Sequence, residues 1–332
     1  MVIILLSAVA TFFLSLAWGL VARSLGIMDI PNVRSSHSYP LPRGGGIAIL
    51  AVFSVFYFGI QGFGSVLSSY MIIPALVIGL MGLMDDMRGI RPTVKLCLEL
   101  FCASMVFLGF QYTYLPIGSY NWDTGKWVAA IFALLWISGF TNFFNFMDGI
   151  DGIAAGQSTV AAAFLAIHFT REGDPQLTSI AMLLVGCSLG FLAVNAPLAK
   201  MFMGDVGSLF LGFMLSALVL VGSIRLDIPF WLLALPLYNF IFDPVYTLFR
   251  RVLSREKWYE AHRAHLYQRL FTGGWSHRKV TLVEMSMAIM LGALSLLPNS
   301  NYSMFQVSAA ITVGFLSQVF FLFYVINRTE SP

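Results

Sequence analysis

Long, unbroken runs of apolar residues recur along the whole of this sequence. A helix needs about 17–25 apolar residues to cross the roughly 30 Å hydrocarbon layer of a membrane, and the 332 residues contain eleven runs of about that length or slightly less. Because the runs do not alternate apolar with polar positions, membrane-spanning strands are not expected. We expect an all-α, polytopic integral membrane protein with about 11 transmembrane helices, folded as a single membrane domain over residues 1–332. The expected spans are Met1–Ala22, Gly45–Ile60, Tyr70–Met84, Leu96–Phe110, Trp127–Met147, Ile153–Thr170, Leu177–Val194, Ser208–Ser223, Ile228–Phe249, Thr281–Leu297 and Met304–Ile326.

The composition excludes other classes of protein. Apolar and aromatic residues make up 58% of the chain and charged residues only 11%, where a soluble protein carries about a quarter charged. A soluble fold of this size leaves roughly a quarter of its surface wet and could not hide so many apolar side chains. A soluble enzyme, a disordered chain and a nucleic-acid-binding module are therefore excluded.

The basic residues indicate the orientation in the membrane. Sixteen of the 19 lysines and arginines fall in one alternate set of connections, which begins with Arg23 and ends with Arg328. The other set holds only Lys126, Arg171 and Arg225. Because basic residues accumulate in cytoplasmic loops, the first set is predicted to be cytoplasmic. The N-terminus is then outside, the C-terminus is cytoplasmic, and residues 250–280 form the longest cytoplasmic loop.

Five aspartates are expected at this same surface. Asp85 and Asp86 end the third run, Asp148 and Asp151 follow the fifth, and Asp205 lies between the seventh and eighth. Carboxylates next to a membrane are costly and usually functional. Polar and cationic residues near them in the expected topology are Asn142, Asn145, Lys95, Lys200, Arg263, His262 and His265.

These residue types indicate phosphoryl chemistry. Hard oxygen ligands without a thiolate suit Mg²⁺, or else Mn²⁺, and neighbouring cations can neutralise a phosphorylated substrate. Glycines follow Arg43, flank Asp148 and Asp151, and flank Asp205, each time just before an expected helix. Backbone N–H groups at such helix starts favour anions.

Each signal also has a simpler explanation. Asp85 and Asp86 can be an ordinary polar helix end, Asn142 and Asn145 can join neighbouring helices, and Lys200 with the basic run after Arg250 can serve only orientation or anionic lipids. A transporter of an anionic envelope precursor is the alternative from another class, but it would need ionisable groups near the bilayer midplane. Only Glu99, His168, Asp243 and Glu284 are candidates for that depth.

The motifs resemble those of the polyprenyl-phosphate N-acetylhexosamine-1-phosphate transferases. Residues 82–96, GLMDDMRGIRPTVKL, are similar to their G-x-x-D-D…P-x-x-K motif, and residues 141–157, TNFFNFMDGIDGIAAGQ, to their N-x-x-N-x-x-D-G-x-D-G motif. Residues 195–208, NAPLAKMFMGDVGS, resemble the N…F-M-G-D-x-G-S motif, and residues 262–270, HRAHLYQRL, the last histidine-containing loop. The first loop resembles the branch that initiates O-antigen and other surface polysaccharides. CDP-alcohol phosphotransferases share only the D-G-x-x-A part of the second motif.

The resemblance implies an activity. Members of that family transfer a sugar 1-phosphate from a UDP-N-acetyl sugar to undecaprenyl phosphate and release UMP, at the cytoplasmic face of the bacterial inner membrane. The possible donors carry GlcNAc, GalNAc, FucNAc or QuiNAc. A homodimer is a further possibility that the family suggests.

The resemblance also implies roles for individual residues. Asp205 would bind Mg²⁺, with Asn145 as a second ligand or neighbour. Asp85, with Asp86 beside it, would be the catalytic contact to the lipid phosphate, either as a base or as an electrostatic guide. Lys95 and Arg263 would neutralise phosphates, and Phe202 would stack on uracil in a pocket lined by Asn195, Asp148 and Asp151. The remaining candidates are His265 as a catalytic residue and Asn142, Lys200, His262 and Arg43 as substrate-binding residues. Many relatives carry further histidines where this chain has Tyr267 and Gln268.

The residues that distinguish one donor sugar from another are expected in the first and last cytoplasmic loops. The candidates are Arg34, Ser36, His37, Arg43 and residues 259–268.

Overall fold

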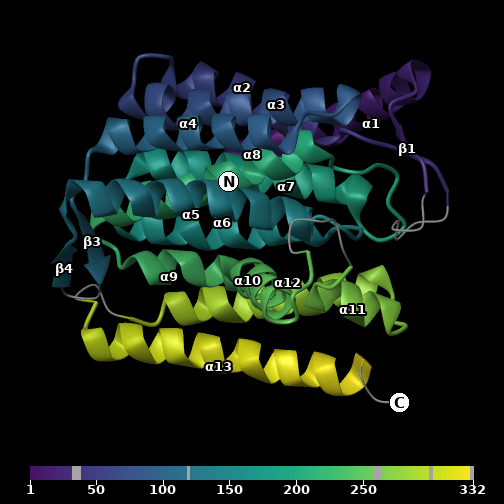
Figure 1. Ribbon diagram of the computed structural model, residues 1–332. Helices are drawn as coiled ribbons and strands as arrows, with labels where there is room; N and C mark the ends of the chain where they lie inside the picture. Colours follow the sequence, from purple (N-terminus) through teal and green to yellow (C-terminus); the bar gives the residue numbers. More distant parts are fainter. Residues whose placement is uncertain (32–38, 118–119, 258–262, 299–301, 330–332) are drawn as a thin grey trace.

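A computed structural model describes residues 1–31, 39–117, 120–257, 263–298 and 302–329, and these residues form a bundle of long helices (Figure 1). Arg34, Ser36, His37 and His262 lie outside the described residues. The helices are α1 Val2–Leu25, α2 Gly46–Gln61, η1 Ser68–Ile72, α3 Ile73–Arg88, α4 Pro92–Phe110, α5 Gly125–Met147, α6 Ile153–Arg171, α7 Pro175–Asn195, α8 Asp205–Leu226, α9 Phe230–Ala234, η2 Leu235–Leu237, α10 Tyr238–Leu253, α11 Leu266–Thr272, α12 His277–Ser295 and α13 Met304–Thr329.

Every expected span overlaps one helix or a series of consecutive helices, and the protein is a polytopic membrane protein. Among the described residues, nine helical segments are long and apolar enough to cross a membrane. The two expected spans outside this set are α2, which has only 16 residues, and α12, whose first turn carries His277, Arg278 and Lys279. The count of eleven spans stays a prediction.

Two short β-ladders interrupt the helical pattern, although strands were not expected. Strand β1 (Met28–Asp29) pairs antiparallel with β2 (Leu41–Pro42), and β3 (Tyr114–Ile117) pairs with β4 (Tyr120–Asp123). Each ladder lies in a connection between helices, so neither alters the helical membrane core. Pairing satisfies backbone groups that an irregular loop would leave to water.

The helices place their connections at two opposite ends of the bundle. Figure 1 shows β3 and β4 at one end, which we call the hairpin end, and β1, α11 and the C-terminal end of the described chain at the other. We call this second end the site end. The connections from α3 to α4, from α5 to α6 and from α7 to α8 all reach it. The motif residues are therefore gathered from distant parts of the sequence.

Helix α8 forms the centre of the bundle. Its side chains from Val206 to Ser223 are all buried, and it packs on both α3 and α5. A helix that is apolar on every side is stable only when other helices surround it. Asp205 is its first residue, so the central helix fixes the position of the one acidic group on which the predicted chemistry depends.

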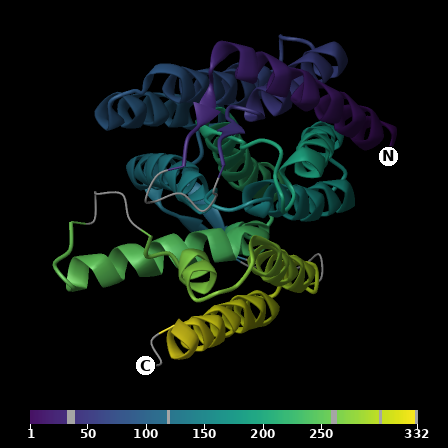
Figure 2. The same ribbon diagram turned by 90° about the vertical axis from the view of Figure 1, so that its right-hand side faces the viewer.

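The ninth expected span is broken into α9, η2 and α10. Pro236 interrupts the helix because it has no N–H and its ring crowds the preceding turn. Gln157 donates to the carbonyl of Pro236 at 2.6 Å, and Asn239 donates to the carboxylate of Glu284 at 2.7 Å. Helix α10 is seen nearly end-on in Figure 1 and lengthwise in Figure 2, so it lies across the other helices.

The contact between α3 and α8 depends on a residue without a side chain. A Cβ atom on Gly82 would collide with the backbone oxygen of Asp205, whereas a Cβ atom on Gly139 in α5 would meet nothing within 4 Å. We predict that Gly82→Ala lowers the free energy of unfolding by about 1–3 kcal/mol, the usual cost of overpacking. Gly139→Ala is the matched control and should be neutral. The apparent unfolding temperature in detergent tests this, and equal temperatures for the two variants would contradict it.

Candidate active site

Two acidic side chains at the site end share one lysine. Lys95 Nζ, in the first turn of α4, lies 2.7 Å from Asp85 Oδ2 and 3.2 Å from Asp205 Oδ2. Pro92 starts α4 and sets the short turn that returns Lys95 toward the end of α3. Residues of the first motif and of the motif around Asp205 therefore lie in contact at the site end.

Asp86 has a different role from its neighbour. Its side chain is fully buried and accepts hydrogen bonds from the backbone N–H groups of Asp205 at 2.9 Å and Val206 at 3.1 Å. These are free donors at the first turn of α8, where a carboxylate is favoured. Arg43 Nε completes the cluster at 2.8 Å from Asp86 Oδ1. Asp86 thus holds the start of α8, and we assign it to positioning.

Asp205 has partners from two further segments, the first loop and α5. Its Oδ1 lies 3.3 Å from Arg43 Nη2 and accepts a hydrogen bond from Asn145 Nδ2 at 3.2 Å. Asn145 also donates to Ser208 Oγ at 2.8 Å. Gly204 precedes Asp205 with φ of 74°, and a Cβ atom there would collide with the carboxylate of Asp86. Only glycine permits both this backbone angle and this approach.

The first loop is fixed to the connection between α7 and α8. Phe202 N donates to Pro42 O at 2.9 Å, Gly45 N to Phe202 O at 3.0 Å, and Gly46 N to Met203 O at 2.9 Å. These backbone bonds place Arg43 beside the aspartates and leave Phe202 half-buried. An aromatic ring at this edge of the cluster can stack on a flat ligand.

Asp151 and Asn195 form a second polar group. Asp151 Oδ2 accepts from the N–H groups of Leu198 and Ala199, both at 3.2 Å, and lies 3.3 Å from His277 Nδ1. Although burial alone would raise the pKa of Asp151, these donors hold the pKa of its carboxyl below its ordinary value.

Asn195 reinforces the same connection from the other side. It accepts from Gly152 N at 3.0 Å and donates to Met201 O at 2.9 Å. Together Asp151 and Asn195 shape the chain between residues 195 and 201, so they support the loop that carries Phe202.

Asp148 is positioned to hold a proton near neutral pH. Burial raises the pKa of its carboxyl to about 7, helped by the negative charges of Asp205 and Asp86 and opposed by Arg43. The carboxyl follows the last residue of α5. Its carboxyl interacts electrostatically with Asp205, Asp86 and Arg43.

His265 is held by an acid that the motif does not contain. Its Nδ1 lies 3.1 Å from Asp243 Oδ1, and Tyr267 N donates to Asp243 Oδ2 at 3.2 Å. Asp243 lies on α10 and was considered from the sequence for midplane depth and as support for a kink before Pro244. Nothing in the sequence links this acid to His265, which lies in another connection.

The other candidates are distributed around this centre. Asn142 donates to the carboxylate of Glu99 and to Ser138 O, so its amide nitrogen joins α4 to α5. Lys200 is exposed, and Arg263 is half-buried just before His265. His277, which the sequence reasoning missed, lies at the start of α12, far from the other motifs in sequence.

The donor set fits a hard divalent cation. The ammonium of Lys95 already stands between the carboxylates of Asp85 and Asp205, so both acids face one cationic position. Asn145 turns its amide nitrogen toward Asp205, so ligation through its oxygen would require the amide to rotate. Within the described residues no three His, Cys, Asp or Glu side chains surround one metal position. Phosphate or water oxygens would complete the coordination of Mg²⁺.

Comparison with known proteins identifies the family of this chain. Residues 68–223, which include Asp85, Asp148 and Asp205, match the model of glycosyl transferase family 4. The chain is 32% identical over 274 residues to a protein of Bacillus subtilis named as a probable undecaprenyl-phosphate N-acetylglucosaminyl 1-phosphate transferase, covering 79% of this chain and 75% of the relative. The chain belongs to glycosyl transferase family 4.

Other members of glycosyl transferase family 4 match over most of their length. A decaprenyl-phosphate N-acetylglucosaminephosphotransferase of Mycobacterium leprae is 30% identical over 84% of this chain and 78% of the relative. An undecaprenyl-phosphate alpha-N-acetylglucosaminyl 1-phosphate transferase of Escherichia coli K12 is 26% identical over 93% of this chain and 86% of the relative. These matches confirm the family predicted from the motifs.

The two adjacent aspartates should differ in their effect on stability. We predict that Asp86→Ala lowers the free energy of unfolding by about 3 kcal/mol, because it leaves two helix N–H groups without their buried acceptor and leaves Arg43 only its longer contact with Asp205. Asp85→Ala should cost about 1 kcal/mol, because Lys95 keeps Asp205 and water reaches the site. Thermal unfolding in detergent compares them. A larger loss for Asp85→Ala would contradict the positioning role.

Proposed function

We propose that this protein transfers N-acetylhexosamine 1-phosphate from a UDP-sugar to undecaprenyl phosphate and releases UMP. The observation that carries the proposal is the convergence of Asp85, Asp205 and Lys95 with Arg43 at one end of a membrane bundle, in a chain whose family relatives carry names of this activity. UDP-N-acetylglucosamine is the first donor to test, because the relatives above act on N-acetylglucosamine by name.

The reaction exchanges one phosphoanhydride bond for another. An oxygen of the lipid phosphate attacks the phosphorus that carries the sugar, a new P–O–P bond forms, and the bond to the UMP phosphate breaks. The electron pair of that bond leaves with UMP. A phosphate monoester has a second pKa of about 6 and is already a dianion at neutral pH. The main barrier is the repulsion between two anionic substrates.

The charged groups of the site address this repulsion. Lys95 and Arg43 are cations held near Asp85 and Asp205, and they can neutralise phosphate oxygens that enter between them. Arg263 is a further candidate before His265. Asp85 is partly exposed beside Lys95. The lipid phosphate is oriented because the carboxylate of Asp85 repels it and the neighbouring Lys95 attracts it.

Mg²⁺ is the cofactor proposed for this site, with Mn²⁺ as a substitute. Asp205 would hold it with Asp85 nearby, and Asn145 would join through its oxygen after rotation of the amide. A bound divalent ion supplies neutralisation of the pyrophosphate charge that builds up during transfer. The residues of the chain bring the two substrates to this point.

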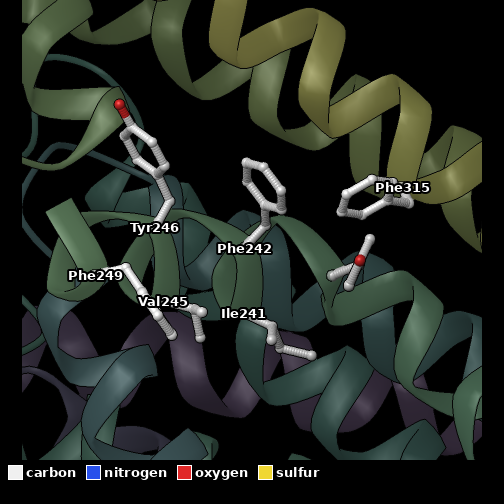
Figure 3. Close-up of a pocket in the computed structure, with 7 residues that line it drawn as sticks. Ile241, Phe242, Val245, Tyr246, Phe249 and Phe315 are labelled. Carbon is white, nitrogen blue, oxygen red and sulfur yellow. The ribbon is translucent and has the colours of Figure 1, made fainter.

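An apolar groove between α10 and α13 suits the polyprenyl chain. Its cavity of about 330 Å³ is lined by Tyr238, Ile241, Phe242, Val245, Tyr246, Phe249 and Phe315. Figure 3 shows these side chains, with Phe242 and Phe315 lying across the groove from each other, at 6.3 Å between ring centroids. An isoprenoid tail is apolar along its whole length and would bury against such a surface.

The second polar group suits the nucleotide. Asp151 and Asn195 fix the chain around Phe202, whose half-buried ring is proposed to stack on uracil. Asp148 interacts electrostatically with Asp205. We propose that the whole chain forms one membrane domain. The reaction would be the first membrane step in the synthesis of a cell-envelope polysaccharide.

The activity is tested by UMP release from purified protein with UDP-N-acetylglucosamine and undecaprenyl phosphate, with the lipid product identified by mass spectrometry. Asp205→Ala should fall below about 1% of the wild-type rate, because loss of one group that stabilises charge in the transition state costs about 10²–10³-fold. A metal chelator should stop the reaction, and added Mg²⁺ should restore it.

Controls separate this proposal from its competitors. Asp123→Ala, at the exposed hairpin end, should keep the wild-type rate. Donors carrying GalNAc, FucNAc or QuiNAc in the same assay identify the sugar. Release of CMP from a CDP-linked donor would indicate the CDP-alcohol class. Absence of release from every donor would leave the transporter explanation.

We further propose that the site end faces the cytoplasm of the bacterial inner membrane. Lys200 at the site end and Asp123 at the hairpin end are both exposed. In a variant without the native cysteines, Asp123→Cys should react with an impermeant maleimide in spheroplasts, and Lys200→Cys should react only after the membrane is opened. The reverse pattern would overturn the orientation predicted from the basic residues.

A further inference from the structure

Helix α10 has two chemically different faces. Phe242 and Tyr246 line the apolar groove on one face, whereas Asp243 and Thr247 are buried on the other, with 3% and 1% of their surfaces exposed. A buried carboxylate is costly unless donors surround it. The contacts of Asp243 therefore indicate why an acid stands here.

Three donors from three positions reach the Asp243 carboxylate. Thr247 Oγ1 donates to Oδ1 at 3.0 Å, His265 Nδ1 lies 3.1 Å from the same oxygen, and Tyr267 N donates to Oδ2 at 3.2 Å. An ionised carboxylate only accepts, so with Asp243 ionised and the His265 ring neutral the ring hydrogen is on Nδ1. Asp243 thus selects the tautomer of a histidine that lies 22 residues away in the sequence.

The same contacts join the histidine to the end of α5. Tyr267 OH donates to Phe146 O at 3.0 Å, and the ring of Phe146 lies 6.3 Å from that of His265. A Cβ atom on Gly149 would collide with the Tyr267 hydroxyl, which accounts for glycine after Asp148. The ring of His265 is therefore fixed next to the segment that carries Asn145 and Asp148.

We propose that Asp243 is a positioning residue for the transfer reaction, which holds His265 in the Nδ1–H tautomer so that Nε2 is the nitrogen presented to the substrate phosphates. The inference rests on the proposed function. It uses the arrangement in which a buried aspartate orients a reactive histidine through Nδ1. Asp243 acts through His265 and does not touch the substrates.

Asp243→Asn keeps the shape of the side chain but removes its negative charge and one of its two acceptor oxygens. An amide presents one acceptor atom and one NH₂ group, so either the N–H of Tyr267 or Nδ1–H of His265 would face a donor. The imidazole of His265 would then turn to a new orientation or change to the Nε2–H tautomer. We expect kcat to fall at least tenfold, with KM for both substrates within about twofold, because the effect lies in the reacting complex.

A double-mutant cycle distinguishes positioning from folding. His265→Asn keeps an N–H at the position of Nδ1 for Asp243 and removes Nε2. In that background Asp243→Asn should change kcat by less than about twofold, since its target is already gone. Thr247→Val is the matched control, because it removes a donor to the same carboxylate without touching His265, and it should keep kcat within about twofold.

Nitrogen-15 NMR of histidine-labelled wild type tests the tautomer without any Asp243 variant. The resonances of His265 are assigned by their loss in His265→Asn, and the Nδ1–H form is expected. The Nε2–H form, wild-type kcat in Asp243→Asn, or an equal loss in the His265→Asn background would each overturn the inference. A wild-type protein that releases no UMP would instead refute the proposed function.

Discussion

The buried carboxylate of Asp86 is the contact on which the rest of the site depends. It binds the first two N–H groups of the central helix and the guanidinium of Arg43. Without it the start of α8 would be an uncompensated helix end next to a membrane, and Asp205 would lose its fixed position. Asp85, Lys95 and Asn145 are useful only because Asp205 is already in place.

The apolar surroundings of the bundle explain why a few charged residues are enough to hold the site together. In a low-dielectric surrounding each ion pair and each helix terminus acts more strongly than it would in water. Arg43 and Lys95 can therefore form ion pairs with Asp85, Asp86 and Asp205 and still bind a phosphate that enters the site. The same surrounding makes the pKa of Asp148 high and forces Asp243 to find three donors.

The long helices were predictable because length and hydropathy decide them, although α4 and α12 each begin four residues before the expected spans. The four motifs also identified the family and most of the polar cluster, since their residues lie in four connections that had to meet at one surface. The sequence could not separate Asp85 from Asp86, because adjacent residues near a helix end point in different directions only once the neighbouring helix is known. The two β-ladders and the break at Pro236 depend on long-range packing in the same way.

The sequence by itself determined a polytopic helical membrane protein, the sidedness of its charges as a prediction, and the membership of its family. The tertiary structure decided which acid caps α8, which histidine contacts Asp151, and that Asp243 on α10 holds His265. The physical reason is the distance along the sequence over which each feature is decided. Hydrophobic runs and charge bias are summed along the chain, whereas a hydrogen bond between residues 22 or more positions apart exists only after the helices have packed.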